Sequence, residues 1–237
     1  MHHWRLSSFY FAYFALIGAI VPYWTLYLTS VNFDPIEIGF LASILMGTKV
    51  VSPYLFGWLS DKFQAPVSVI RITSALSLIA FSFIFITDSF VGTALVIASF
   101  SFFWNGQIGQ FESITLSHIS NDTSRYGGIR AWGSIGFIVS VLALGFLIKK
   151  NGINYLPLFM TVILFLIVLS SLIVNKTDQI KPHNDQKRFL HEFLKPNVIF
   201  FFITCFLLQV SHGPYYTFFS IYLTEWNPSF GEVSPVQ

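Results

Sequence analysis

Residues 155–174 read YLPLFMTVILFLIVLSSLIV, a run of 20 residues without one charged side chain. A helix needs about 20 mostly apolar residues to cross the hydrocarbon core of a bilayer. Six more stretches are long and apolar enough to cross as well, near residues 7–29, 38–58, 67–87, 91–117, 128–148 and 197–223. The sequence therefore predicts an all-α polytopic membrane protein with seven spans.

The composition of the 237-residue chain agrees with this class and excludes several others. Only 10% of its residues are charged, against about 25% in soluble domains, and 54% are apolar. The formal net charge of +2 is too near neutral to suggest nucleic acid as a partner. The single cysteine, Cys205, lies in an apolar run and supports neither a disulfide framework nor a cysteine metal site. We expect no metal, no cofactor and no enzymatic centre, because the sequence offers no His or Asp cluster and no Ser/His pair at one depth.

Basic residues in the loops predict the orientation of the chain, because cytoplasmic loops carry an excess of Lys and Arg. With the N-terminus inside, ten basic residues fall on the cytoplasmic side and only Lys149 and Lys150 fall outside. The hydrophilic segment 175–196 is then a cytoplasmic linker, whose charges fit topology and contact with lipid headgroups better than a protein partner. We therefore expect a multi-pass protein of the cell (inner) membrane with a cytoplasmic N-terminus.

The seventh predicted span repeats the first at a fixed offset of 195 residues. TLYLT (residues 25–29) aligns with SIYLT (residues 220–224), and Gly18 aligns with Gly213. The seventh span comes six spans after the first, an even number, so both cross the membrane in the same direction. Such a parallel repeat resembles the two halves of major facilitator transporters.

This resemblance implies three parts, with residues 1–174 as a six-helix N-terminal half, 175–196 as the central linker and 197–237 as the first helix of a C-terminal half. The second copy ends at Gln237, where its second helix is expected to begin. We therefore expect a truncated chain, either a fragment or an interrupted reading frame. Alternating access needs two halves that rock about a shared site, so the chain alone is expected to be inactive and to need the missing C-terminal half.

The loop between the second and third spans reads GWLSDK (residues 57–62). It resembles the major facilitator loop motif Gly-x-Leu-x-Asp-Arg/Lys, in which Gly lets two helices approach and Asp pairs with basic groups in a contact that opens as the halves rock. The resemblance makes Gly57, Asp61 and Lys62 candidate gating residues. The basic tail of the motif is replaced by FQAP, so Arg71 is expected to substitute for it.

Glu112 and Arg130 are the most informative charged residues within the spans. Each lies nine residues from position 121, the middle of a short polar turn, so an antiparallel hairpin places them at equal depth. A carboxylate and a guanidinium can pair there, and buried charges in a bilayer usually face a water-filled path. The alternative is a structural clamp between two helices near the cytoplasmic face, with glycines for close packing. Residue types alone do not separate the two.

An acid eighteen residues before an Arg that is followed by x-x-Gly-x-x-Gly-aromatic resembles the oligosaccharide–proton symporters. The run RAWGSIGF (residues 130–137) is still closer to the phenylpropionic acid permease group, which are proton symporters of small aromatic acids. The resemblance implies that Glu112 and Arg130 bind substrate and that Phe137 packs on the substrate ring. The sugar transporters have Trp at the position of Phe137, and the change to Phe removes an indole donor that a sugar would use.

Two further residues are candidates for substrate contact. Lys49 lies eleven residues into the second span, about 16 Å deep by helix rise. A second cation at that depth favours an anionic substrate, and the alternative is a bond to carbonyls of a neighbouring helix. Trp24 follows the kink expected at Pro22 and is the aromatic side chain of the first span best placed for stacking on a ligand.

Asn105, Gln209 and His212 are candidates for a proton site or another polar site. Asn105 can line the cavity or hydrogen-bond helices together, and the second role is favoured. His212 and Gln209 lie beside Gly213-Pro214, where we expect a break in the seventh span. His212 can titrate there or make a structural hydrogen bond, and the sequence leaves both open.

These features predict a secondary active transporter, a proton-coupled symporter of a small organic solute that is an aromatic acid or sugar-like. Its expected partners are the solute, protons and membrane lipids. The rival interpretation is a non-transporting seven-helix receptor or scaffold. A cytoplasmic N-terminus carrying Arg5, and the lack of a second cysteine for an external disulfide, argue against a receptor.

Overall fold

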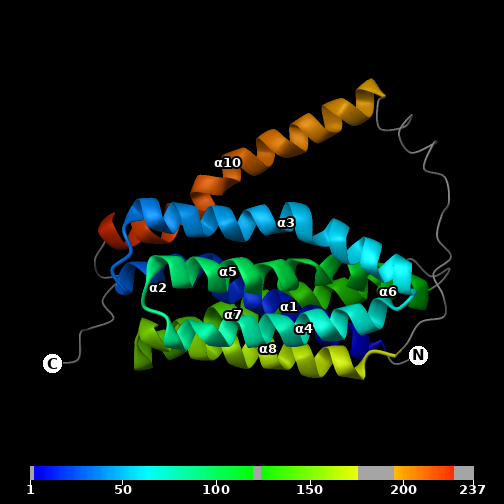
Figure 1. Cartoon of the computed structure of the whole chain (residues 1–237), viewed down its shortest axis with the longest axis horizontal. Helices are drawn as coiled ribbons and strands as arrows, with labels where there is room; N and C mark the ends of the chain where they lie inside the picture. Colours follow the sequence, from blue (N-terminus) through cyan, green and yellow to red (C-terminus); the bar gives the residue numbers. More distant parts are fainter. Residues whose placement is uncertain (1–2, 120–123, 176–194, 227–237) are drawn as a thin grey trace. The chain divides into compact units, whose positions relative to one another are not determined.

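The computed structural model describes residues 3–119, 124–175 and 195–226 (Figure 1). These residues fall into two units, a six-helix unit from Trp4 to Ile173 and a single long helix, α10. The helical segments are α1 (Trp4–Ala19), η1 (Ile20–Trp24), α2 (Thr25–Ser30), α3 (Pro35–Phe63), α4 (Pro66–Ser82), η2 (Phe83–Ile86), α5 (Phe90–Asn105), α6 (Gln107–Ile119), α7 (Ser124–Asn151), η3 (Ile153–Tyr155), α8 (Leu156–Ile173) and α10 (Pro196–Trp226). They form seven helical rods long and apolar enough to cross a membrane, which confirms the seven predicted spans to within a few residues.

Local sequence sets the ends of these helices. At the start of α3, the Asp34 carboxylate accepts a bond from the Glu37 amide at 2.8 Å, and the Glu37 carboxylate accepts one from the Asp34 amide at 3.0 Å. This reciprocal cap, followed by Pro35 at the first helical position, is a strong helix start. The helix ends where Gln64 takes a left-handed conformation at φ 48°. Short connections of this kind force neighbouring spans to run antiparallel.

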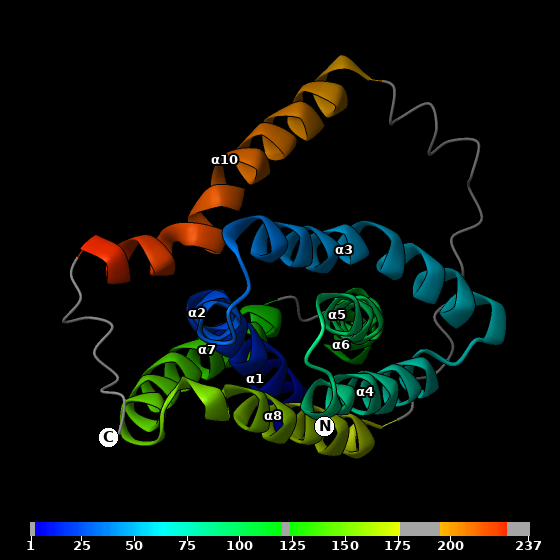
Figure 2. The ribbon, with the colours of Figure 1, turned by 60° about the vertical axis from the view of Figure 1, so that its left-hand side comes forward.

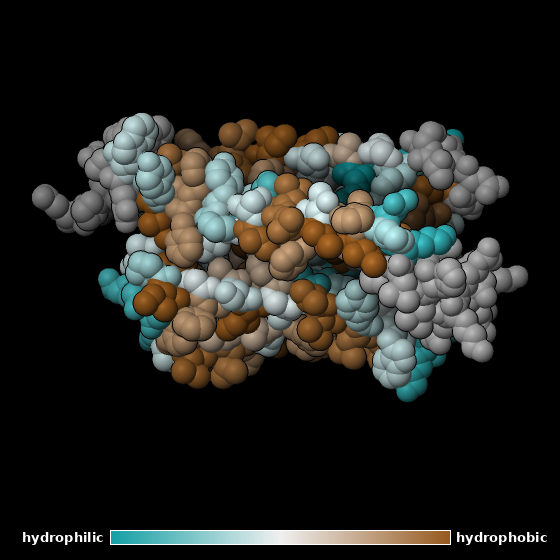
Figure 3. Space-filling view, turned by 90° about the horizontal axis from the view of Figure 1, so that it is seen from above, coloured by the Kyte–Doolittle hydropathy of each residue, from teal (hydrophilic) through white to brown (hydrophobic). Residues whose placement is uncertain are grey.

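The six-helix unit is held together by aromatic and small side chains between its spans. Helix α1 packs against α7 and α8, while α5 and α6 lie between α3 and α4 (Figure 2). The largest fully buried side chains include Trp104, Tyr10, Phe9, Phe81 and Phe111. Large apolar side chains are also exposed over much of the surface, as the face in Figure 3 illustrates. An apolar exterior around a packed interior is what a lipid-embedded helix bundle requires.

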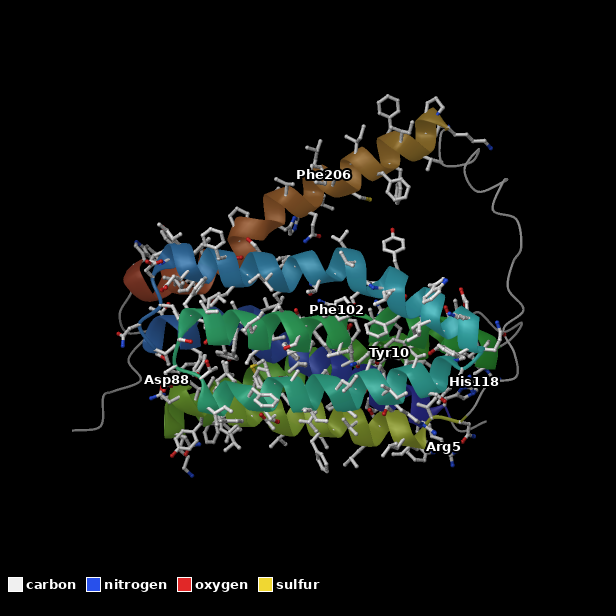
Figure 4. The ribbon with its side chains drawn as sticks, in the orientation of Figure 1. Arg5, Tyr10, Asp88, Phe102, His118 and Phe206 are labelled. Atoms are coloured by element: carbon white, nitrogen blue, oxygen red, sulfur yellow. The ribbon has the colours of Figure 1, made fainter. Side chains whose placement is uncertain are left out.

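One end of the six-helix unit gathers the basic residues Arg5 and Arg71. Figure 4 places Arg5 and His118 at this end and Asp88 at the other. The guanidinium of Arg5 donates to the Asn175 side chain at 2.7 Å. Arg71 donates to three carbonyls at the C-terminal end of α8, those of Ser171, Leu172 and Val174. The expectation that Arg71 substitutes for the basic tail of the loop motif is therefore wrong, because its donors are used to cap α8.

Helix α10 runs without interruption from Pro196 to Trp226, with Pro214 inside it. The break expected at Gly213-Pro214 is thus absent, and the helix bends instead (Figure 2). Proline removes one backbone donor and commonly kinks a helix that otherwise continues. The predicted linker, 175–196, lies almost wholly outside the described residues.

Candidate functional site

The candidate site is built on a close crossing of α1 and α7. A Cβ atom added at Gly18 would lie 2.7 Å from the carbonyl oxygen of Phe137. A Cβ at Gly136 would overlap the carbonyl of Phe11 in the same way. The two backbones therefore touch at two levels, and small residues are the usual means of such contact in membranes. This contact fixes the register of the side chains on the two helices.

Arg130 of α7 pairs with Glu112 of α6, as the equal distances from the turn predicted. The Nη2 atom of Arg130 lies 3.5 Å from the Oε1 atom of Glu112. The side chains keep 37% and 35% of their surface exposed. The pair is thus partly accessible, and charged groups within membrane spans usually face a water-filled path.

The guanidinium of Arg130 also lies over two aromatic rings of α1. Its central carbon is 4.8 Å from the ring centre of Phe14 and 5.5 Å from that of Tyr10. Tyr10, labelled in Figure 4, donates its hydroxyl to the Oγ1 atom of Thr115 on α6 at 3.3 Å. The Nη1 atom of Arg130 is buried and has no hydrogen-bond partner among the described residues. A guanidinium held between aromatic rings, with one donor unpaired, is suited to hydrogen-bond a carboxylate oxygen.

The sequence predicted no contact of Tyr10 or Phe14 with Arg130. Aromatic residues make up 19% of the chain, so their presence in a span carries little information. The usable signal is their spacing of four residues, which places both on one face of α1. That face lies against Gly133, one turn from Arg130, where a Cβ would be 2.8 Å from Phe14.

Two other predicted contact residues, Phe137 and Lys49, remain partly or fully accessible. Phe137 is half-buried and follows Arg130 by two helical turns, so it lies on the same flank of α7. Lys49 is exposed, and no described residue forms a hydrogen bond or ion pair with it. Its position on α3 is between Leu45 and Ser52, both buried, and thus on the stripe that packs against other helices.

Asn105 is not part of this accessible site. Its side chain is buried, and its amide nitrogen donates to the Leu45 carbonyl at 3.2 Å and to the Thr48 hydroxyl at 2.9 Å. These bonds join the end of α5 to α3. The favoured interpretation, hydrogen bonding between helices, fits this arrangement.

Comparison with known proteins places the chain in a family. Residues 3–232 match the family described as MFS_1 like. The chain belongs to the MFS_1 like family. It is 25% identical to a probable 3-phenylpropionic acid transporter of Escherichia coli (strain K12), over 92% of this chain and 58% of that protein. It is 30% identical to an uncharacterized transporter, YwbF, of Bacillus subtilis (strain 168), over 61% of this chain and 36% of that one.

A solved structure shares the fold. The crystal structure of the nucleoside transporter NupG superposes with a TM-score of 0.80 at 22% identity, covering 98% of this chain and 60% of that one. The chain thus spans between about a third and three fifths of the length of the proteins it matches. It is a multi-pass membrane protein of a transporter family, with the major facilitator fold.

The loop motif GWLSDK (residues 57–62) makes only some of the contacts expected of it. Gly57 allows close approach, since a Cβ there would lie 3.3 Å from the side-chain nitrogen of Gln110. The Lys62 ammonium lies 4.7 Å from the ring centre of Trp58. The Asp61 carboxylate forms no ion pair with any described residue, although its backbone carbonyl accepts from Gln64.

Trp24 lies elsewhere than predicted. Its side chain is only 5% exposed, and its ring packs 5.4 Å from Tyr27 and 6.1 Å from Phe81. Residues 20–24 form a π-helical turn, which rotates the following side chains relative to an α-helix. Trp24 therefore belongs to the core of the six-helix unit, and stacking on a ligand is not available to it in this arrangement.

His212 and Gln209 lie on α10. The Nδ1 atom of His212 donates to the Leu208 carbonyl at 2.8 Å, within the same helix. Its ring lies 5.6 Å from that of Tyr216. Gln209 is exposed on α10. The structure supports the structural hydrogen bond for His212.

Proposed function

We propose that this chain provides the N-terminal substrate-binding half of a proton-coupled symporter of a small organic anion, with an aromatic carboxylate as the preferred solute. The observation that carries the proposal is the Arg130 guanidinium, paired with Glu112 through Nη2 and buried without a partner at Nη1. A buried donor with no acceptor is costly, and a solute carboxylate would satisfy it.

The charges of the site support an anion in particular. Glu112 balances the positive charge of Arg130, and Lys49 on α3 is a second cation with no acidic partner among the described residues. A carboxylate arriving at Nη1 leaves the Glu112 contact in place. Phe137 on the same flank of α7 offers an apolar ring for the aromatic part of the solute.

One of the relatives supports the same solute class. The match to the probable 3-phenylpropionic acid transporter extends over 92% of this chain. A sugar-like solute is the alternative, and the Phe at position 137 disfavours it because Phe has no hydrogen-bond donor. Proton coupling, a cytoplasmic N-terminus and residence in the cell (inner) membrane belong to the proposal as well.

Uptake of radiolabelled 3-phenylpropionate by the intact transporter that contains this chain tests the proposal. We expect uptake to depend on an inward proton gradient and to stop when a protonophore is added. Arg130→Gln should abolish it, while the same cells should keep the protein in their membranes. Uptake of maltose but not of 3-phenylpropionate would replace the anionic solute with a sugar, and uptake indifferent to the protonophore would remove proton coupling.

A further inference from the structure

We propose that Phe14 and Tyr10 are positioning residues for Arg130, and that Gly133 is required because it leaves room for the Phe14 ring. The inference concerns the position of the Arg130 guanidinium, which can be measured without any solute. What this position means for solute selection rests on the proposed function.

The two rings form a cradle on one face of α1. Tyr10 and Phe14 are four residues apart and therefore point the same way. The guanidinium lies 5.5 Å and 4.8 Å from their centres. Tyr10 is itself fixed, by its hydroxyl bond to Thr115 and by an edge-to-face contact with Phe111 at 5.0 Å.

Gly133 holds the other side of the cradle. A Cβ there would lie 2.8, 3.1 and 3.3 Å from three carbons of the Phe14 ring. A movement of α1 along α7 cannot make room for an added methyl group, because the two backbones already touch at Gly18 and Gly136. A side chain at position 133 must therefore displace the ring that supports Arg130.

This cradle determines which edge of Arg130 is free. A guanidinium stacks on aromatic rings through its face and donates hydrogen bonds in its own plane. With its central carbon 5.5 and 4.8 Å from the two ring centres, the guanidinium reaches Glu112 through Nη2, while Nη1 is buried and has no hydrogen-bond partner among the described residues. A solute carboxylate oxygen would satisfy the Nη1 donor, and a guanidinium is more weakly hydrated than an ammonium. The cradle thus selects a carboxylate over a neutral, hydroxyl-rich solute.

Chemical modification of Arg130 tests the positioning directly. The intact transporter is treated with phenylglyoxal, which attacks arginine, and the modified fraction at residue 130 is followed by mass spectrometry. A cation stabilised by rings should react slowly, so Phe14→Leu should raise the rate by about 2- to 30-fold, the range expected for a cation–π contact. Phe14→Tyr should react like the wild type because it keeps a ring.

Phe11→Leu is the matched control. It is the same substitution on the same helix, and no cation lies over the Phe11 ring among the described residues. Its Arg130 should react at the wild-type rate. Equal rates in Phe14→Leu and Phe11→Leu would overturn the positioning role, whatever happens to transport.

Gly133→Ala extends the test to the glycine. On its own it should raise the Arg130 reaction rate, and in a Phe14→Leu background it should add little, because both changes act through one ring. If the rate increases of Gly133→Ala and Phe14→Leu were fully additive, Gly133 would not act through the Phe14 ring. In uptake assays the KM for 3-phenylpropionate should rise in Phe14→Leu with Vmax retained. If the modification rates change as expected but no uptake depends on Arg130, the positioning stands and the proposed function fails.

Discussion

The six-helix unit contains two close helix crossings that treat polar groups in opposite ways. Where α3 meets α5 and α6, Gly106 lies against Phe56 and Ser52, and Asn105, Thr48 and Ser101 bond to one another or to backbone. Where α1 meets α7, Gly18 and Gly136 bring the backbones together, yet Arg130 and Glu112 stay about one third exposed.

The contrast separates structural polar groups from functional ones. Glycines at a crossing say only that the helices are close, and both crossings have them. At the crossing of α3 with α5 and α6, which we call the closed crossing, the polar groups bond to one another, and this stabilises a helix pair in lipid. At the crossing of α1 with α7, which we call the open crossing, one donor of Arg130 has no partner among the described residues, and this costs stability unless a ligand accepts from it. Mutations at the two crossings should therefore have different readouts.

The largest effect is expected at the open crossing. Arg130→Gln and Glu112→Gln in the intact transporter should each lower kcat/KM for uptake by about 10- to 100-fold, because a hydrogen bond to a charged group contributes about 1.5–3 kcal/mol. The assay is initial uptake rate per molecule of protein in the membrane. Arg130→Lys should recover little, since an ammonium has no planar edge.

Loss of protein rather than loss of transport would show that the Glu112–Arg130 pair stabilises the fold. If protein levels collapse in these variants while the remaining molecules transport normally, Glu112 and Arg130 form a structural clamp. Asn105→Ala, at the closed crossing, is the comparison in the same assay.

The glycines give a second test, of intermediate size. Gly136→Ala should lower the free energy of unfolding by about 1–3 kcal/mol, the usual cost of overpacking, and also weaken solute binding because the new atom meets the rigid Phe11 carbonyl. Gly106→Ala meets side-chain atoms, those of the Phe56 ring and the Ser52 hydroxyl, rather than backbone. Thermal unfolding of the purified transporter should therefore fall more for Gly136→Ala, and only that variant should change KM. An unchanged KM in both would contradict the distinction.

The sequence predicted the spans well because about 20 apolar residues in a row allow one structure in a bilayer. It also predicted the Glu112–Arg130 pair, since equal distances from a turn fix equal depth in a hairpin. The contacts of Arg71 could not be predicted. Several acceptors lie near the same end of the bundle, and the choice of the α8 carbonyls depends on packing.

The aromatic residues mark the limit of sequence reasoning in this chain. Trp24 was predicted to face a ligand, but the π-helical turn at residues 20–24 changes which side of the span it occupies. The contact of Tyr10 and Phe14 with Arg130 was not predicted, because only the register of α1 on α7 brings their rings next to the guanidinium. That register depends on backbone contact at Gly18 and Gly136, which no spacing rule for a single helix contains.

A smaller effect is expected from Asn105 at the closed crossing. Asn105→Ala removes two hydrogen bonds between α5 and α3 and should lower the free energy of unfolding by about 1 kcal/mol, typical of polar contacts between membrane helices. The KM for solute should not change. Thr48→Val removes the hydroxyl partner, and the double variant should lose less than the sum, measured by thermal unfolding. A raised KM with normal stability would move Asn105 into the solute site.

The smallest effect is expected at Lys49, which shares one feature with each crossing. It is on the packing stripe of α3 beside Leu45 and Ser52, but its side chain is exposed and has no partner among the described residues. If it adds positive potential to the open site, Lys49→Met should raise the KM for 3-phenylpropionate by about 2- to 5-fold, as a charge acting at a distance does. Lys49→Arg should retain the wild-type KM, and inhibition of uptake by the uncharged amide of the same acid should not depend on residue 49. A lower unfolding temperature with an unchanged KM would instead place Lys49 in the closed crossing, bonded to backbone carbonyls of a neighbouring helix.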